Sequence, residues 1–235
     1  MTDRPAIAFV CAHLCDERLY AAQRAALAAS HDCRVFVFRD ADTLAAMAEA
    51  VLAAMPPRFT LVGLSLGGYI AMEIVRLALD RVDRLALLDT TASADTPQRR
   101  AARIADIAKV EAGGIEALIP ELPARWLLPE HLARAELVAT LGEMARSVGA
   151  TGQRHQQRAM LARRDSHDDL ARVAVPTLVL CGEQDRVTPV ADHAAMAARI
   201  AHARLERIAD CGHLATIEQP EAVSRVLIDW LASSR

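Results

Sequence analysis

The chain has 235 residues, 53% of them hydrophobic, which is enough to bury the core of one domain with an insertion. Its formal net charge is −3 and neither sign forms a long run, so the charge pattern gives no reason to expect a nucleic-acid or membrane partner. An odd number of cysteines, five, in a chain of this size favours reduced, packed thiols. The apolar run at residues 6–15 lacks a cleavage pattern and no run is long enough to span a bilayer, so we expect a cytoplasmic protein.

The first third of the chain alternates between short apolar runs and helix-like segments. The apolar runs are continuous rather than alternating, as in strands that are buried on both faces. This pattern predicts an α/β fold with a mostly parallel sheet and helices on both faces. Strands are expected at residues 6–11, 35–38, 59–64 and 85–88, and helices at residues 17–29, 42–54 (capped by Asp42) and 69–79.

Between residues 90 and 172 no strand pattern appears, and a structureless loop of that length inside a compact domain is implausible. Thr96-Pro97 opens a helix in which Ile104, Ile107 and Ala108 share helical spacing, and Gly113-Gly114 ends it. We expect a helical cap at residues 92–171, with an α/β core at residues 1–91 and 172–235. A helical excursion with no role in substrate choice is the alternative. Two more cap helices are expected, from Pro129 to residue 147 and from Thr151 to residue 164.

After this segment the alternation resumes. Strands are expected at residues 175–181 and 205–208, and helices at residues 189–200 and 221–231, the last with Val223, Leu227 and Trp230 on one face.

The stretch Gly63-Leu64-Ser65-Leu66-Gly67 joins a predicted strand to a predicted helix. A serine between two such glycines is typical of a nucleophile on a sharp strand-to-helix turn. The N–H of Leu66 then lies at the positive end of the following helix, where it is suited to bind a developing oxyanion. We therefore predict Ser65 as a nucleophile and Leu66 as an oxyanion donor.

A serine nucleophile needs a base, and the base needs a group that fixes its tautomer. Asp185 follows the strand at 175–181 and His213 follows the strand at 205–208, which gives the order Ser65, Asp185, His213. Asp89, at the end of the preceding strand, and Asp210 are the alternatives to Asp185.

Three motifs occur in order along the chain: Gly63-Leu-Ser-Leu-Gly-Gly68, Gly182-Glu-Gln-Asp-Arg-Val-Thr-Pro189 and Gly212-His-Leu-Ala-Thr-Ile-Glu-Gln-Pro220. Together they resemble the α/β-hydrolase superfamily over essentially the whole chain. The resemblance implies an abbreviated core, a helical cap after the strand at 85–88, and a catalytic triad of Ser65, Asp185 and His213. Relatives usually carry His-Gly or Pro-Gly after the first strand, where this chain has Cys11-Ala12-His13. By position, His13 supplies the second oxyanion N–H.

The expected activity is hydrolysis of a carboxylic ester with a small or aliphatic acyl group, through an acyl-enzyme intermediate. Leu14, Trp126 and Leu127 are predicted to contact this small-molecule substrate. No cofactor is expected, and no metal site either, because Cys11 and Cys15 have no second pair with ligand spacing.

Two other functions stay open. A carbon–carbon or thioester hydrolase is the alternative on the same triad, and a cationic pocket residue facing Ser65 would favour it. A hydrolase-like receptor with negligible turnover is the other. The cap arginines that are candidates for binding a substrate carboxylate are Arg125, Arg163 and Arg164.

Overall fold

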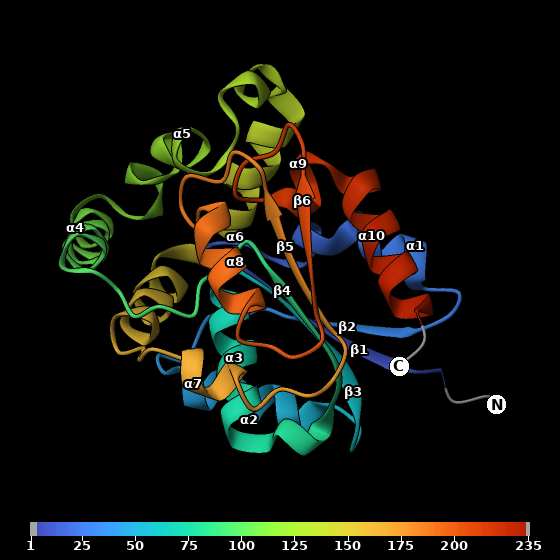
Figure 1. Ribbon diagram of the computed structural model, residues 1–235. Helices are drawn as coiled ribbons and strands as arrows, with labels where there is room; N and C mark the ends of the chain where they lie inside the picture. Colours follow the sequence, from blue (N-terminus) through green and yellow to red (C-terminus); the bar gives the residue numbers. More distant parts are fainter. Residues whose placement is uncertain (1–3, 234–235) are drawn as a thin grey trace.

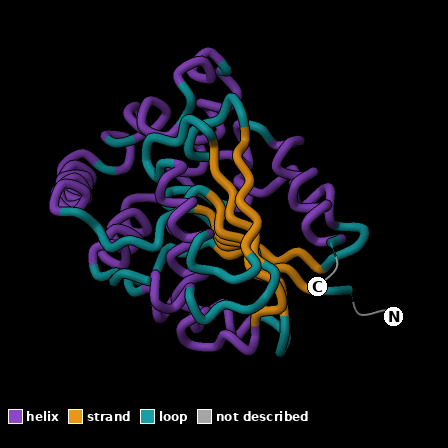
Figure 2. Tube along the Cα trace, in the orientation of Figure 1, coloured by secondary structure: helices purple, strands orange, loops and turns teal. Residues whose placement is uncertain are grey.

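The computed structural model describes residues 4–233 and contains one twisted sheet at its centre, with helices around it (Figures 1 and 2). The strand order is β2-β1-β3-β4-β5-β6, and every neighbouring pair is parallel. The predicted α/β class with a largely parallel sheet is therefore confirmed. The strands are β1 (Ala6–Val10), β2 (Asp32–Phe36), β3 (Phe59–Leu64), β4 (Val82–Leu88), β5 (Thr177–Gly182) and β6 (Ala203–Ile208).

Helices cover both faces of the sheet because successive side chains of each buried strand point to opposite sides. In β1, Ile7 and Phe9 pack in one apolar cluster, whereas Ala8 and Val10 pack in the other. The first cluster is covered by α1 (Ala21–Leu27) and α10 (Pro220–Ala232). The second is covered by α2 (Leu44–Ala54), α3 (Leu66–Ala78) and α8 (Val190–Ala197).

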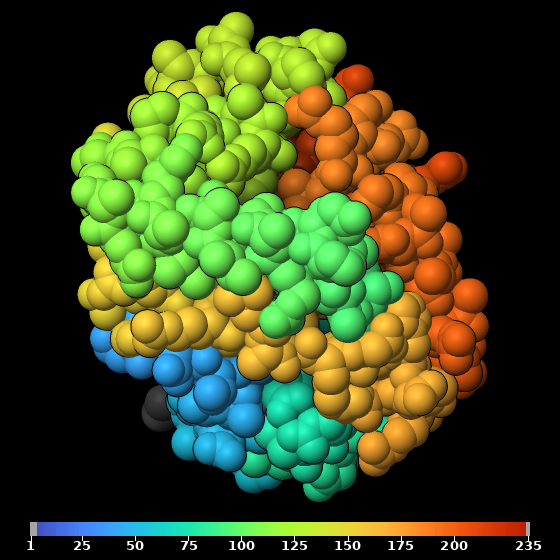
Figure 3. Space-filling view, turned by 90° about the vertical axis from the view of Figure 1, so that its left-hand side faces the viewer, coloured from blue at the N-terminus to red at the C-terminus, as the bar shows by residue number. Residues whose placement is uncertain are grey.

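Between β4 and β5 the described chain forms helices and loops and no strand. In Figure 3 this segment forms a continuous green-to-yellow surface above the blue and teal surface of the N-terminal part. We keep the division into a core and a cap at residues 92–171 as a prediction. The helices of this segment are α4 (Pro97–Gly113), α5 (Leu122–Trp126), α6 (Ala135–Leu161) and α7 (His167–Leu170), with 3₁₀ helices at Ile115–Ala117, Ile119–Glu121 and Pro129–Ala133.

The remaining helices are short. They are α9 (Ala215–Glu218) and the 3₁₀ helices Glu17–Tyr20 and Leu79–Arg81.

Several element boundaries differ from those predicted. β2 begins at Asp32, because Asp32 pairs with Ala6 at the edge of the sheet, where only one side of the strand needs a partner. The side chain that caps α2 is that of Thr43, which accepts from the Ala46 N–H, and not that of Asp42. The predicted break between residues 147 and 151 is present inside α6, because Gly149 has non-helical backbone angles, φ +73° and ψ 177°, and divides α6 into two helical stretches.

Candidate active site

Ser65 lies where β3 ends and α3 begins, at the carboxyl edge of the sheet, where open α/β sheets bind their ligands. Its backbone is strained, with φ +54° and ψ −111°. The turn leaves no room for neighbouring side chains. A Cβ on Gly63 would lie 2.2 Å from the Gly67 carbonyl oxygen, and a Cβ on Gly67 would lie 2.0 Å from the Val10 carbonyl oxygen. The glycines are therefore required by close backbone approach, and they hold the serine in the strained conformation.

The structure brings the three predicted triad residues together. Ser65 Oγ lies 3.0 Å from His213 Nε2, and His213 Nδ1 lies 2.8 Å from Asp185 Oδ2. The imidazole is 3% exposed, and it comes from the loop after β6, while Asp185 comes from the loop after β5. Because Asp185 accepts the Nδ1 proton, the other ring nitrogen is free to accept the serine proton.

Donors around Asp185 fix its carboxylate. Oδ1 accepts from the N–H groups of Val187 and Thr188 at 2.8 and 3.0 Å, and Oδ2 also accepts from the Thr188 hydroxyl at 2.7 Å. Burial alone would raise the pKa of Asp185, but the positive charge and hydrogen bond of His213, together with the Thr188 bonds, lower it. The carboxylate is therefore held in the ionised form that an imidazolium needs.

The two alternatives to Asp185 have other positions. Asp89 is fully buried and accepts from the Gly182 N–H at 2.9 Å and from the Ala215 N–H at 3.1 Å. Asp89 thus connects the end of β5, which leads to Asp185, with the start of α9, which follows His213. It has no hydrogen bond to the imidazole among the described residues. Asp210 is exposed on the surface.

The two predicted oxyanion donors lie in the loops after β1 and β3. Among residues 4–233, neither the Leu66 N–H nor the His13 N–H has a hydrogen-bond partner, so both remain available to a ligand. Leu14, which follows His13, has φ +56°. Each of the two N–H groups is therefore next to a residue with a strained backbone, Leu14 beside His13 and Ser65 beside Leu66.

The His13 side chain is held against α6. Its Nδ1 donates to Gln156 Oε1 at 2.8 Å, and its Nε2 accepts from Gln157 Nε2 at 3.3 Å. Burial, followed by the positive charge of Arg103, lowers the pKa of His13 from 6.5 to about 3. The ring is therefore neutral at neutral pH, and its tautomer carries the proton on Nδ1.

A small cavity of about 70 Å³ opens on Ser65 and His213. This is roughly the space of two or three water molecules. The predicted substrate residue Trp126 lines it, but Leu14 and Leu127 are buried and lie outside its wall, because both pack into the apolar cluster beneath. The lining residues are Ala12, His13, Ser65, Tyr69, Arg103, Trp126, Met160, Val187, His213 and Leu214.

The cationic residue in this wall is Arg103, which sequence reasoning missed. Ile104 belongs to the apolar spacing that predicted α4, but it is 56% exposed, whereas its neighbour Arg103 lines the cavity. The sequence feature that could have indicated a buried Arg103 is Asp95, an acidic residue just before α4. Asp95 is buried and forms an ion pair with Arg103. The predicted candidates are engaged elsewhere: Arg125 pairs with Asp106 and Glu121, Arg163 with Asp95, and Arg164 with Asp169.

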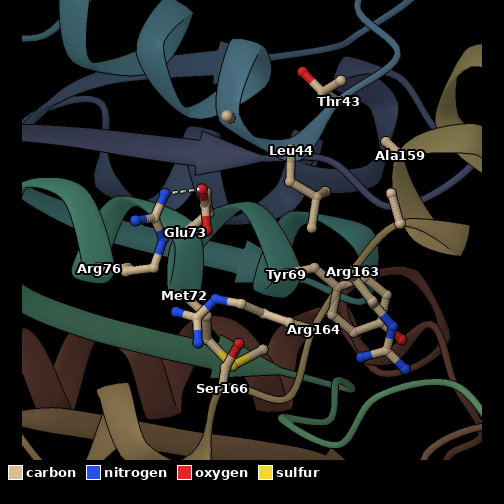
Figure 4. A pocket seen from close by; sticks show the side chains of 12 residues that line it. Thr43, Leu44, Tyr69, Met72, Glu73, Arg76, Ala159, Arg163, Arg164 and Ser166 are labelled. Atoms are coloured by element: carbon tan, nitrogen blue, oxygen red, sulfur yellow. Dashed lines mark hydrogen bonds and ion pairs between the residues drawn. The ribbon is translucent and has the colours of Figure 1, made fainter.

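A larger hollow of about 370 Å³ lies beside this cavity, between α2, α3 and the end of α6. Figure 4 shows it, with the ion pair of Glu73 and Arg76 on one side and Tyr69 next to Arg163 on the other. The Arg163 guanidinium lies 4.1 Å from the centre of the Tyr69 ring. Because Tyr69 lines both spaces, it forms part of the wall between them.

The described residues hold no group of three or more metal-ligating side chains. The thiols of all five cysteines are free. No helix within residues 4–233 is both long and apolar enough to cross a membrane. A cytoplasmic location stays a prediction.

A model of the family described as "Alpha/beta hydrolase family" matches residues 8–226. The chain belongs to the α/β-hydrolase family. A curated relative of this chain, 3-oxoadipate enol-lactonase 2 of Acinetobacter baylyi, is 28% identical over 172 residues, which are 73% of this chain and 62% of the relative. The chain therefore spans less than two thirds of the length of that relative.

Solved structures support the fold over the whole chain. A thermophilic esterase from Thermogutta terrifontis, with malate bound, is 29% identical at a TM-score of 0.88, covering 97% of this chain and 89% of that chain. The enol-lactonase from Burkholderia xenovorans LB400 has a TM-score of 0.90 at 24% identity, covering 98% and 92% of the two chains. At that identity the second likeness shows the fold alone.

Proposed function

We propose that this protein is a serine-dependent hydrolase of carboxylic esters with small acyl groups, acting through an acyl-enzyme intermediate. The observation that carries the proposal is the hydrogen-bonded chain from Ser65 Oγ to His213 Nε2, at 3.0 Å, and from His213 Nδ1 to Asp185 Oδ2, at 2.8 Å. The enol-lactonase and esterase names of the relatives agree with ester chemistry, since a lactone is a cyclic ester.

In the first half-reaction His213 Nε2 takes the proton of Ser65 Oγ as that oxygen bonds to the ester carbonyl carbon. The carbonyl oxygen becomes an oxyanion, which the N–H groups of Leu66 and His13 stabilise. When the tetrahedral intermediate collapses, the bond to the leaving alkoxide breaks and the imidazolium returns the proton to it. Asp185 stabilises the imidazolium throughout.

In the second half-reaction water takes the place of the alcohol. His213 removes a proton from the water as its oxygen bonds to the acyl carbon, and the proton then passes to Ser65 Oγ as the acyl–serine bond breaks. The products are the acid and the free enzyme, so atoms and charge balance. The small cavity and its apolar wall residues, including Trp126 and Val187, support a preference for short acyl groups.

The test is labelling with a fluorophosphonate probe, mapped by mass spectrometry, together with turnover of short p-nitrophenyl esters. We expect labelling at Ser65, and loss of at least about a thousandfold in kcat in Ser65→Ala. Ser166→Ala is the matched control, because Ser166 lines the neighbouring hollow and not the catalytic cavity. Equal rates in wild type and Ser65→Ala would overturn the proposal, and absent turnover with retained ligand binding would favour a hydrolase-like receptor.

Thioester or carbon–carbon bond hydrolysis is a second candidate, favoured by the cationic Arg103 in the cavity wall. Oxygen esters and thioesters of the same acyl group, compared at equal concentrations, separate the two. A kcat/KM for the thioester that exceeds that for the ester by more than the ratio of their uncatalysed rates would favour the second candidate.

A further inference from the structure

Arg103 is the cationic side chain in the wall of the catalytic cavity, and its hydrogen bonds leave capacity for a ligand. Its side chain is 16% exposed. Nε and Nη2 donate to the two oxygens of Asp95, at 2.6 and 3.3 Å, and Nη1 donates to Gln157 Oε1 at 3.1 Å and to the Met160 sulfur at 3.0 Å. A guanidinium has five N–H groups, and a thioether is a weak acceptor. One N–H is therefore without a partner among the described residues, and a second is weakly bound.

The charges around Arg103 do not cancel. Asp95 is 1% exposed and is shared by Arg103 and Arg163, whose own side chain is 3% exposed. Burial alone would raise the pKa of Asp95, but the bonds and charges of Arg103 and Arg163 lower it, so Asp95 is ionised. Two guanidinium groups on one carboxylate leave one positive charge beside the cavity.

The other titratable groups that face this cluster do not supply the missing negative charge. His13 lies in the same cavity wall and is neutral at neutral pH. Asp185 is committed to His213 and Thr188. Burying an unpaired charge is costly, so an enclosed positive charge that borders a cavity is best explained by an anionic ligand.

We propose that Arg103 binds a carboxylate of the substrate, so that this hydrolase acts on esters or lactones whose acyl part carries a second, ionised carboxyl group. A guanidinium matches a carboxylate in shape and charge, and such hydrogen bonds are about twice as strong as neutral ones. The inference rests on the proposed ester hydrolysis at Ser65. It assigns Arg103 as the residue that selects the substrate class.

The experiment compares two sets of methyl esters that differ in charge. The first set is the monomethyl esters of malonate, succinate and glutarate, and the second is methyl propionate, butyrate and valerate, with turnover followed by pH-stat titration. The enzymes are wild type, Arg103→Gln, Arg103→Lys and Arg100→Gln. Arg100 is the matched control, because it lies three residues earlier in α4, bonds to the Leu161 carbonyl and does not line the cavity.

The readout is the ratio of kcat/KM for each charged ester to that for its uncharged partner. We expect Arg103→Gln to lower this ratio by about 10- to 100-fold for at least one chain length, since hydrogen bonds to charged groups contribute on that scale. Arg103→Lys should keep part of the preference, and Arg100→Gln should keep all of it. A purely structural role of Arg103 would lower both sets of esters alike and leave the ratio unchanged, which would overturn the inference.

Ser65→Ala separates the failure of this inference from failure of the proposed function. If methyl butyrate turnover does not depend on Ser65, the proposed function fails. If it does depend on Ser65 but Arg103→Gln leaves every ratio unchanged, only the carboxylate assignment fails.

A measurement on wild type decides the case in which Arg103→Gln does not fold. We expect succinate to inhibit methyl butyrate hydrolysis competitively, more strongly than butyrate does, and to lose potency as NaCl is added. Equal inhibition by the two acids would overturn the assignment.

Discussion

At the scale of single residues, two buried aspartates near the triad, Asp185 and Asp89, have different roles. Asp185 accepts the His213 Nδ1 proton, whereas Asp89 accepts backbone N–H groups from Gly182 and Ala215. Both are at most 5% exposed, so burial alone does not tell them apart. The difference lies in the hydrogen-bond donor. Asp185 accepts from an imidazole that can change its charge, whereas Asp89 accepts from backbone N–H groups that cannot.

We predict that Asp185→Asn lowers kcat for a short ester by about 10³- to 10⁴-fold, because the amide no longer holds the imidazole in the tautomer that accepts the serine proton. The matched variant is Asp89→Asn, in which one of the two backbone donors loses its acceptor. It should lower the free energy of unfolding by about 1–3 kcal/mol and kcat by much less. Initial rates and urea unfolding measure the two effects. A larger kcat loss in Asp89→Asn than in Asp185→Asn would reverse the assignment.

At the scale of elements, one side chain of α6 holds the loop that carries His13, the proposed second oxyanion donor. Gln156 Oε1 accepts from the Leu14 N–H at 2.9 Å and from His13 Nδ1 at 2.8 Å, and Gln156 Nε2 donates to the Phe38 carbonyl at 2.6 Å. Ala12 stands in this loop where the resemblance to α/β-hydrolases leads us to expect glycine. The glutamine therefore fixes, from another element, a loop whose own sequence lacks that glycine.

We predict that Gln156→Leu lowers the free energy of unfolding by about 1–3 kcal/mol, because the buried Leu14 N–H loses its acceptor. It should also lower kcat more than it raises KM, because the proposed role of the His13 N–H is to bind the oxyanion of the transition state. Ester kinetics and urea unfolding measure both.

Gln153→Leu is the matched control on the same helix. Gln153 is fully buried, and neither of its side-chain polar atoms has a partner within residues 4–233. Its replacement should therefore be neutral or stabilising and leave kcat unchanged. Equal losses of kcat in both variants would show that any leucine in this part of α6 disturbs the enzyme, and would contradict the specific role of Gln156.

The sequence predicts those features of the site that depend on short stretches of neighbouring residues. The glycines around Ser65 indicate a turn between a strand and a helix, and Asp185 and His213 each follow an apolar strand. The sequence therefore predicts the order of the three residues and the edge of the sheet at which they lie. Parallel strands then bring the loops together, and the structure places Ser65 Oγ 3.0 Å from His213 Nε2 and His213 Nδ1 2.8 Å from Asp185 Oδ2.

The features that the sequence does not predict depend on packing between distant elements. The rotation of α4, which exposes Ile104 and turns Arg103 inward, follows from its contacts with α6 and from Asp95, and not from the apolar spacing of the helix itself. The same holds for Gln156, which is 142 residues away from its partner Leu14. Helical periodicity cannot distinguish a face that packs on another polar side chain from one that faces solvent.

At the scale of the whole molecule, His13 lies where the loop after β1 meets α6, so its protonation state is coupled to the packing of the cap segment on the sheet. Burial and the charge of Arg103 lower the pKa of His13 from 6.5 to about 3. In the unfolded chain the same imidazole titrates near its usual value. Between these two pH values, the imidazole of His13 is therefore protonated in the unfolded state and neutral in the folded state.

This difference predicts how stability depends on pH. The contribution of neutral His13 is fully present above pH 6.5, and it is lost as the pH falls toward the folded pKa of about 3. The slope of the free energy of unfolding against pH in this window is up to about 1.4 kcal/mol per pH unit.

His13→Asn removes the titration and keeps a donor at the position of Nδ1. Urea unfolding of both proteins at several pH values between about 7 and 4 should show wild type losing stability more steeply as the pH falls. His193 is also buried with a lowered pKa, but it is present in both proteins and cancels in the comparison. Parallel curves for the two proteins would mean that His13 takes up its proton without opposing the fold, and the packing of the loop against α6 would then not depend on its charge.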